Sequence, residues 1–301
     1  MGYQLDGKLV IGISSRALFD LEEANQIYET QGLKAYQAYQ VANEQIALQP
    51  GSGFPIVQAL LKLNEHAYNP RPVEVIVMSR NSADTSLRIF NSLEYYNLPI
   101  TRAILSGGAS LSAYLKAFKV DLFLSAHEED VQQAIDSDVA AGRIYPQPWN
   151  GQEEIHPLRI AFDGDAVLFS ADSEYIYQSQ GLEAFQDNEK AHANEVMKEG
   201  PFANFLKALS AIQQNFPKED SPIRTALVTA RNAPAHERVI KTLRSWNVNI
   251  DEAFFLGGIQ KAEVLEAFGA HIFFDDQTVH TDPASKVVPS AQVPYKHKGN
   301  D

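Results

Sequence analysis

The second half of the chain carries residues that could transfer a phosphoryl group. Asp163 and Asp165 flank Gly164, directly after the apolar run 158–162. Two carboxylates in one tight turn allow one to attack phosphorus while the other moves a proton, as in covalent catalysis through an aspartyl-phosphate. Acidic pairs are common on solvated turns, so this pair needs support from other segments.

Three further segments supply complementary groups. Thr229 could donate hydrogen bonds to phosphate oxygens. Lys261 is a compact positive charge that suits a phosphoryl group in transfer. Asp275 and Asp276 offer the oxygen ligands that magnesium prefers. Four carboxylates brought together would repel one another without a cation, so these residues predict a Mg²⁺ site.

The elements that position these residues occur twice in the chain. The segment IYETQGLKAYQ (27–37) matches IYQSQGLEAFQ (176–186) at seven of eleven positions, at a shift of 149. Later matches drift by one or two residues, as between LKAFKVDLFLSA (115–126) and LEAFGAHIFFDD (265–276). The chain is therefore predicted to contain two similar units, at about 8–131 and 157–281.

Each unit shows the same alternation of strands and helices. The predicted strands are 9–13, 73–78, 103–105 and 122–124 in the first unit, and 158–162, 225–228, 253–256 and 272–274 in the second. Predicted helices include 82–95 and 235–246. This alternation predicts an α/β fold with parallel sheets and helical crossovers. Sites in such folds lie at the carboxyl ends of the strands, where the acidic residues are expected to meet.

Boundaries follow from the repeat and from turn-forming residues. We expect a first unit at 1–131, a linker at 132–156, a second unit at 157–281 and an irregular tail at 282–301. Gly142, Pro146, Pro148 and Gly151 suit a surface connection. Residues 170–216, between the first two strands of the second unit, are expected to form a helical cap over the site.

The order Asp-x-Asp, Thr, Lys, Asp-Asp, each after a predicted strand, resembles the four motifs of the haloacid dehalogenase superfamily of phosphatases. The chain is more closely similar to the cytosolic 5′-nucleotidase I family. The segments that carry this resemblance are SSRALFD (14–20), AFDGDAVLFS (161–170), TARNAPAHERV (229–239) and FFLGG (254–258). The resemblance implies a haloacid dehalogenase-like (HAD-like, Rossmann-like) fold with helices on both sheet faces, a tandem duplication, and hydrolysis of nucleoside 5′-monophosphates such as AMP.

The resemblance also implies roles for the acidic residues. Asp163 would be the nucleophile, and Asp165 the acid that protonates the leaving 5′-oxygen and then the base that activates water. Magnesium would be held by the Asp163 carboxylate, the Asp165 backbone carbonyl and Asp275. Asp276 would be a ligand or lie behind the ligands. The sequence does not decide which of Asp275 and Asp276 binds the metal directly.

Other residues would contact the substrate. The resemblance implies that Thr229 and Lys261 bind the phosphate. Tyr175 could stack on a base, and Asn194 and Arg231 could contact the base or the phosphate. For any one aromatic residue, packing within the cap is the more ordinary role.

The first unit lacks this chemistry. At the positions that match the acidic turn it carries Ser14 and Arg16, and at those that match the last acidic pair it carries Ser125 and Ala126. We therefore expect a catalytically silent copy. It could serve only as structural support, or it could help to bind a nucleotide, because Arg16 and Arg80 suit an anionic ligand.

The amino-acid composition limits the classes of partner that we expect the protein to bind. The chain of 301 residues has a formal net charge of -13 and no cysteine. Nucleic-acid polymers are disfavoured because they require clustered positive charge, and disulfides are excluded. Neither a signal peptide nor an apolar span is recognisable, so we expect no membrane partner and a cytoplasmic location.

Two other functions stay open, a phosphatase of another small ester and a nucleotide-binding regulator with little turnover. A homo-oligomer also stays open.

Overall fold

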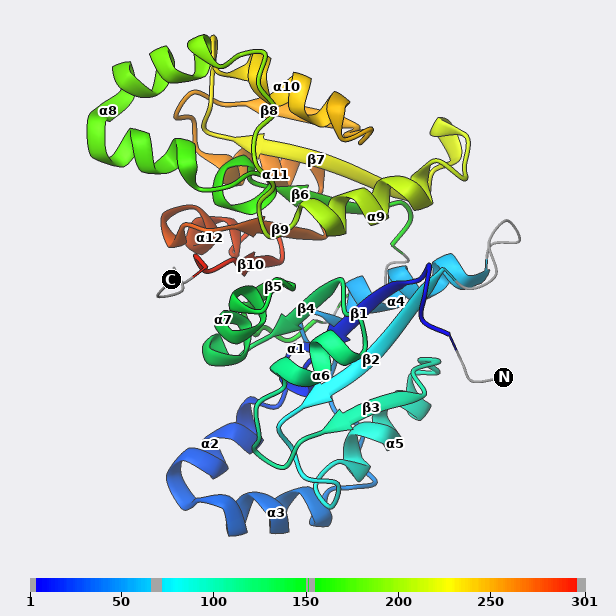
Figure 1. The fold of residues 1–301 in the computed structure, drawn as a ribbon. Coiled ribbons are helices and arrows are strands. Elements are labelled where there is room, and N and C mark those ends of the chain that lie inside the picture. The colour runs from blue at the N-terminus through cyan, green and yellow to red at the C-terminus, as the bar shows by residue number, and fades with distance from the viewer. Residues whose placement is uncertain (1–3, 66–71, 150, 152–154, 297–301) are drawn as a thin grey trace. The chain divides into compact units, whose positions relative to one another are not determined.

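The computed structural model describes residues 4–65, 72–149, 151 and 155–296, and it divides into two compact units (Figure 1). Unit 1 comprises Met1–Val139 and Arg143–Ile155, and unit 2 comprises Ala140–Gly142 and His156–Asp301. Parts of the predicted linker (150, 152–154) and tail (297–301) lie outside the described residues. Among the described residues, no helix is both long enough and apolar enough to cross a membrane.

The first part of the chain alternates strands with helices. Its elements are β1 (Leu9–Ile13), α1 (Ser15–Leu18), α2 (Glu22–Gln31), α3 (Leu33–Ala42), α4 (Phe54–Lys62), the 3₁₀ turn η1 (Leu63–Glu65), β2 (Val73–Ser79), α5 (Leu87–Tyr95), β3 (Arg102–Leu105), α6 (Ser112–Ala117), β4 (Leu122–Ser125), α7 (Glu128–Asp136) and β5 (Ala140–Ile144).

The second part follows the same order. Its elements are β6 (Leu158–Phe162), the wide π turn η2 (Gly164–Leu168), α8 (Asp172–Ala191), α9 (Ala203–Gln213), the 3₁₀ turn η3 (Lys218–Asp220), β7 (Ile223–Thr229), α10 (His236–Ser245), β8 (Glu252–Phe255), α11 (Lys261–Phe268), β9 (Ile272–Asp275), α12 (Thr278–Ala284) and β10 (Ser290–Gln292).

Parallel strands in matching order form the sheet of each unit. The strand order is β3-β2-β1-β4 in unit 1 and β8-β7-β6-β9-β10 in unit 2. The registers match as well, because Leu9 pairs with Val73 at the start of β1 and Leu158 pairs with Ile223 at the start of β6. The predicted α/β class with parallel strands is confirmed.

Helices cover both faces of the sheet in unit 2. Ala161 belongs to a buried cluster with Leu265 of α11 and Ala284 of α12. Phe162, the next residue of β6, points to the opposite face, where its ring lies 6.2 Å from that of Phe205 in α9. A strand that is buried on both faces consists mostly of apolar residues, and all residues of 158–162 except Arg159 are apolar, which explains why the strand was recognisable in the sequence.

The two units share unusual backbone conformations. Gly32, between α2 and α3, has φ 81° and ψ −179°, and Gly181, inside α8, has φ 86° and ψ −177°. Only glycine readily adopts this conformation, and it bends each helical segment into an elbow of two arms (Figure 1). Asn97 and Asn247 also match, with φ of 53° and 54°.

Regular elements occupy parts of the predicted linker and tail. Helix α7 ends at Asp136 and β5 covers Ala140–Ile144, so regular elements occupy the start of the predicted linker 132–156. In the tail, α12 runs to Ala284 and β10 pairs with β9. These short strands lack a clear apolar period, and their pairing with neighbouring backbone decides their structure.

The helix predicted at 82–95 begins later, at Leu87. The hydroxyl of Ser86 donates to the carbonyl of Ser82 at 2.7 Å, and the hydroxyl of Thr85 donates to the same carbonyl at 3.2 Å. Serine and threonine side chains that bond to nearby backbone favour turns over helix interiors. The segment therefore forms a loop after β2.

Candidate active site

The turn after β6 places Asp163 at the carboxyl edge of the sheet in unit 2. The backbone N–H of Asp163 donates to the carbonyl of Phe274 in β9 at 2.8 Å, which ties the ends of the two strands together. Ala166, within the turn, has a φ of 59°, which is costly for a residue with a Cβ. The N–H of Phe169 closes the wide turn on the carbonyl of Gly164 at 2.9 Å.

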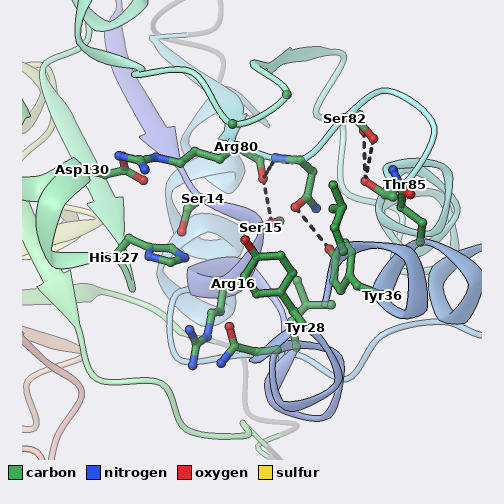
Figure 2. Close-up of a pocket in the computed structure, with 18 residues that line it drawn as sticks. Ser14, Ser15, Arg16, Tyr28, Tyr36, Arg80, Ser82, Thr85, His127 and Asp130 are labelled. Atoms are coloured by element: carbon green, nitrogen blue, oxygen red, sulfur yellow. Dashed lines mark hydrogen bonds and ion pairs between the residues drawn. The ribbon is translucent and has the colours of Figure 1, made fainter. Parts of the chain in front are cut away.

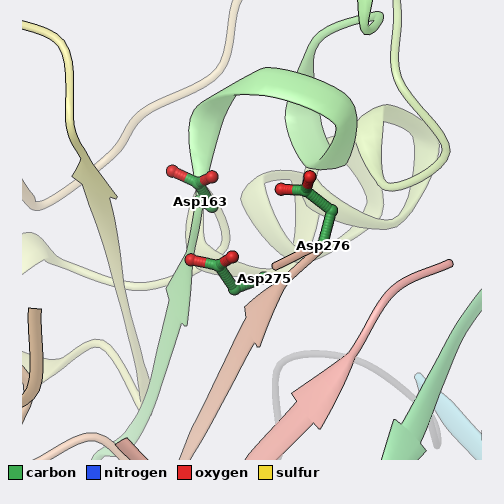
Figure 3. Close-up of side chains that lie close together, drawn as sticks. All are labelled: Asp163, Asp275 and Asp276. Atoms are coloured by element: carbon green, nitrogen blue, oxygen red, sulfur yellow. The ribbon is translucent and has the colours of Figure 1, made fainter. Parts of the chain in front are cut away.

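Three carboxylates gather at these strand ends. One oxygen each of Asp163, Asp275 and Asp276 lies within 4.8 Å of the other two. Figure 3 shows the three side chains where β6 and β9 end, beneath the turn that follows Asp163. All three residues are buried, with at most 5% of their surface exposed. The prediction that the acidic pairs meet at one edge is therefore confirmed for these three side chains.

Lys261 supplies the positive charge at the cluster. It is the first residue of α11, and its Nζ lies 2.8 Å from Asp163 Oδ1 and 2.6 Å from Asp275 Oδ2. The other oxygen of Asp275 accepts the backbone N–H of Gln277 at 2.8 Å. The lysine is 3% exposed, so its charge acts in a poorly solvated environment.

The cluster carries more negative charge than this lysine balances. Burial, together with the charges of Asp275 and Asp165, raises the pKa of Asp163 to about 6 against the opposing effect of Lys261. Burial and the charges of Asp163 and Asp275 raise the pKa of Asp276 to about 8. Burial alone would lower the pKa of Lys261, but Asp163 and Asp275 raise it above its ordinary value.

These residues fit a divalent cation. Asp276 Oδ1 is buried and has no hydrogen-bond partner among the described residues, whereas Oδ2 accepts the hydroxyl of Tyr295. An orphaned carboxylate oxygen next to two other carboxylates leaves an electrostatic demand that a hard cation meets. The Asp163, Asp275 and Asp276 group could therefore hold a metal ion.

The side chain of Asp165 faces a different partner. Its two oxygens accept hydrogen bonds from Arg231 Nε at 2.7 Å and Nη2 at 2.6 Å. Arg231 Nη1 also donates to Glu189 Oε2 at 2.5 Å, and the guanidinium stacks 5.1 Å above the ring of Phe185. The carboxylates of Asp165 and Glu189 raise the pKa of Arg231, against the effect of burial. Arg231 thus binds protein groups, and a role on substrate stays a prediction.

Helix α8 contributes acidic residues that the sequence reasoning missed. Glu189 accepts from Ser173 at 2.8 Å and from Arg238 at 3.0 Å, in addition to Arg231. Glu174 accepts from Gln277, which follows the acidic pair. Glu189 lies 149 residues after the buried Gln40, so the repeat could have marked it as a buried polar position.

The remaining predicted residues take different positions. Thr229 ends β7, is buried, and accepts the N–H of Arg231 at 3.3 Å. A Cβ at Gly164 would lie 3.3 Å from Thr229 Oγ1, so the threonine sits directly against the acidic turn. Asn194 is exposed and accepts from Lys241 at 2.6 Å, and Tyr175 on α8 is 66% exposed. Their contacts with substrate stay predictions.

Parallel strands that end in a buried acidic cluster with a lysine beside it define an α/β protein with a group of carboxylates that could hold a cation at the carboxyl edge of its sheet. The family model described as 5′-nucleotidase matches residues 1–300, and the chain belongs to this family. The resemblance inferred from the sequence is confirmed.

A human relative points in the same direction. The chain is 37% identical over 300 residues to the human protein named cytosolic 5′-nucleotidase 1B, and the match covers 96% of this chain and 49% of that protein. The chain thus spans about half the length of this relative.

Proposed function

We propose that the protein is a magnesium-dependent 5′-nucleotidase that hydrolyses nucleoside 5′-monophosphates such as AMP to nucleoside and phosphate. The observation that carries this proposal is the buried group of Asp163, Asp275 and Asp276 with Lys261 between two of the carboxylates. Membership in the 5′-nucleotidase family supports the choice of substrate class.

In the first step, Asp163 attacks the phosphorus of the bound monophosphate. An Asp163 Oδ–P bond forms as the bond from phosphorus to the 5′-oxygen breaks, and the leaving oxygen takes a proton from Asp165. Lys261 already lies 2.8 Å from Asp163, so it can neutralise both the nucleophile and the phosphoryl group. Thr229, beside the acidic turn, would donate its hydroxyl to a phosphate oxygen.

In the second step, water releases the phosphate. Asp165, now ionised, takes a proton from water, the new hydroxide oxygen bonds to phosphorus, and the Asp163 Oδ–P bond breaks. For both proton transfers the Asp165 side chain must leave the guanidinium of Arg231, which holds both of its oxygens. Before the first transfer it must also take up a proton from solvent. We therefore place an opening of the Asp165–Arg231 pair on the reaction path.

The metal site would be formed by Asp163, the backbone carbonyl of Asp165, Asp275 and Asp276. When bound, magnesium would offset the charge of the carboxylates and of the phosphate, and would orient the phosphate for in-line attack. The buried Asp276 Oδ1 without a hydrogen-bond partner among the described residues supports Asp276 as a ligand.

We also infer a haloacid dehalogenase-like fold that arose by tandem duplication, with α8 as part of a cap. Matching strand orders support the duplication, as do the matching elbows at Gly32 and Gly181. Glu189 of α8 accepts from Arg231, which also binds Asp165, and Glu174 accepts from Gln277, which follows Asp276. These contacts support α8 as part of a cap. Tyr175 and Asn194 are retained as candidate contacts for the base.

The test compares Asp163→Asn with Asp220→Asn, a matched change at an exposed aspartate of η3. We expect Asp163→Asn to lower magnesium-dependent phosphate release from AMP by at least about 10³-fold, because an amide is a poor nucleophile. Asp220→Asn should retain full turnover. Full phosphate release by the Asp163 variant would refute the nucleophile assignment.

A panel of substrates separates the proposal from its alternatives. Purine and pyrimidine monophosphates, ribo and deoxy, are compared with sugar phosphates and other small phosphomonoesters. A preference for nucleotides supports the proposal. Equal rates on all esters favour a phosphatase of broader specificity, and binding of AMP without turnover favours a nucleotide-binding regulator. The name of the human relative, cytosolic 5′-nucleotidase 1B, supports a cytoplasmic location for this chain as well.

A further inference from the structure

A cavity of about 540 Å³ lies at the carboxyl ends of the strands in unit 1. Its lining includes Ser14 after β1, Ser79 and Arg80 at the end of β2, and His127 after β4 (Figure 2). The cavity thus occupies the same edge of its sheet as the acidic cluster does in unit 2. Its volume lies within the range of about 300–1,000 Å³ that small-molecule sites occupy.

The charges of this cavity favour an anion. The charged side chains among its lining residues are Arg16, Arg80 and Asp130, and Arg80 is paired with Asp130 at 2.5 Å. Arg16 Nη2 contacts Glu22, an exposed residue outside the cavity lining, at 2.7 Å. Arg16 Nε is buried and has no hydrogen-bond partner among the described residues. A buried donor of this kind on a cationic group marks a place where an anionic oxygen would be favourable.

Serine hydroxyls line the cavity together with the two arginines. Ser14 and Ser15 follow β1, and Ser15 Oγ lies 3.0 Å from Ser79 Oγ. Hydroxyls can donate to phosphate oxygens without adding negative charge. In contrast to the acidic cluster, this arrangement requires no metal to accept a phosphate.

Aromatic side chains line another part of the cavity. The rings of Tyr28 and Tyr36 are 6.0 Å apart at 82°, and the Tyr36 hydroxyl donates to Asn81 at 3.2 Å (Figure 2). Tyr28 is 51% exposed, so its face is accessible to a planar ring. Stacking on an aromatic face is a common means of holding a nucleobase.

Unit 2 contains the same aromatic pair. Tyr177 and Phe185 lie 149 residues after Tyr28 and Tyr36, and their rings are 6.2 Å apart at 80°. The aromatic geometry is therefore present in both units. The carboxylates of Asp163, Asp275 and Asp276, in contrast, are replaced by Ser14, Ser125 and Ala126 at the matching positions of unit 1. In unit 1 this aromatic pair therefore stands in one cavity with arginine and serine side chains.

We propose that the unit 1 cavity binds a nucleoside phosphate without a metal and without hydrolysing it. Arg16 and the serine hydroxyls hold the phosphate, and Tyr28 stacks on the base. The choice of a nucleoside rests on the proposed function of unit 2, whereas the anionic part of the assignment rests on the cavity itself.

Calorimetric titration of the full chain in EDTA tests the site, with AMP, adenosine and inorganic phosphate as separate probes. EDTA leaves the acidic cluster negatively charged, so binding there is disfavoured. We expect one equivalent of AMP to bind at least tenfold more tightly than either fragment. Equal affinity for adenosine and AMP, or no binding of AMP, would overturn the proposal.

Variants assign the binding to unit 1. Arg16→Gln is expected to weaken AMP binding at least tenfold, and Tyr28→Ala at least threefold for both AMP and adenosine. Lys34→Gln, an exposed cation on α3 outside the cavity lining, should leave the affinity unchanged. Because Tyr28 is half exposed, its variant tests the site even where Arg16→Gln alters folding.

Two further outcomes separate this inference from the proposed function. Loss of AMP binding in Lys261→Met with retention in Arg16→Gln would place the ligand in unit 2 and overturn the inference. Retention of metal-free AMP binding in a chain that shows no phosphate release would support the inference while refuting the proposed nucleotidase.

Discussion

The carboxyl edges of the sheets in unit 1 and unit 2 have a similar backbone arrangement but carry different charged side chains. In unit 2 the turn after the first strand carries Asp163 and Asp165, and in unit 1 it carries Ser14 and Arg16. Lys261 corresponds to Leu111, which is buried like the lysine. Removal of the carboxylates also removes the need for the cation, so the lysine position can become apolar.

This difference shows that two units can have the same strand order while their site residues differ. The sheet core and the glycine elbows occur in both units, because they depend on backbone geometry and apolar burial. The charged residues occur as an interdependent set, because each buried carboxylate in unit 2 requires a partner. A set of this kind is retained or lost together.

The largest expected effect comes from Lys261→Met, which gives unit 2 an apolar residue as in unit 1 but keeps the carboxylates. The metal-free protein should lose about 3–5 kcal/mol of unfolding free energy at pH 7, because Asp163 and Asp275 are left buried without their cation. Urea unfolding in EDTA measures this loss.

Two variants test the cause of that loss. Lys241→Met breaks the exposed pair with Glu237 and should cost no more than about 0.5 kcal/mol. Adding Asp163→Asn to Lys261→Met should recover part of the stability, because one uncompensated charge is removed. If Lys261→Met costs no more than the Lys241 control, the cluster does not depend on its lysine.

A smaller effect is expected from Asp276→Asn, which should increase the free energy of unfolding of the metal-free protein. The pKa of Asp276 is raised to about 8 in the folded protein, so the folded state binds this proton more tightly than the unfolded chain does. Ionisation of Asp276 therefore costs stability as the pH rises from about 4 through about 8. The variant should be more stable than the parent by on the order of 2 kcal/mol at pH 8.

Denaturation in EDTA across this pH range measures the difference between variant and parent, which should vanish near pH 4. Magnesium should then stabilise the parent more than the variant, because the variant lacks one carboxylate ligand. A variant that is less stable than the parent at pH 8 would contradict the charge repulsion inferred for the cluster. Asp220→Asn serves as the control without an expected pH dependence.

The smallest effect is expected at the two elbows. Gly32→Ala and Gly181→Ala should each cost roughly 1 kcal/mol, because both glycines adopt a backbone conformation that a Cβ disfavours. Apart from the adjoining chain, no heavy atom of the described residues lies within 4 Å of a Cβ built at either glycine, so the cost comes from the backbone alone.

Activity distinguishes the two elbow variants. Only Gly181→Ala should lower phosphate release, because α8 carries Glu174 and Glu189 beside the acidic cluster. If both variants lose the same stability and only Gly181→Ala loses turnover, the two elbows are equivalent in structure and only the one in unit 2 serves the acidic cluster. A large difference in stability cost would show that the elbows are not equivalent.

Much of the fold was predictable because its central strands are buried on both faces. Both first strands, Leu9–Ile13 and Leu158–Phe162, have the bounds that their apolar runs predicted. The strands β5 and β10 were not predicted, because they owe their structure to pairing and lack a marked apolar pattern. The loop 82–86 was predicted as helix because side-chain bonds to the backbone are not visible in periodicity.

The sequence by itself indicated the matching segments, the family and the residue types of the acidic cluster, because these depend on local pattern. The tertiary structure decided which carboxylates share a site. It places Asp163, Asp275 and Asp276 together and binds the Asp165 side chain to Arg231. Residues far apart in the chain set these contacts, and in a buried site the partner of each charge determines what that charge can do.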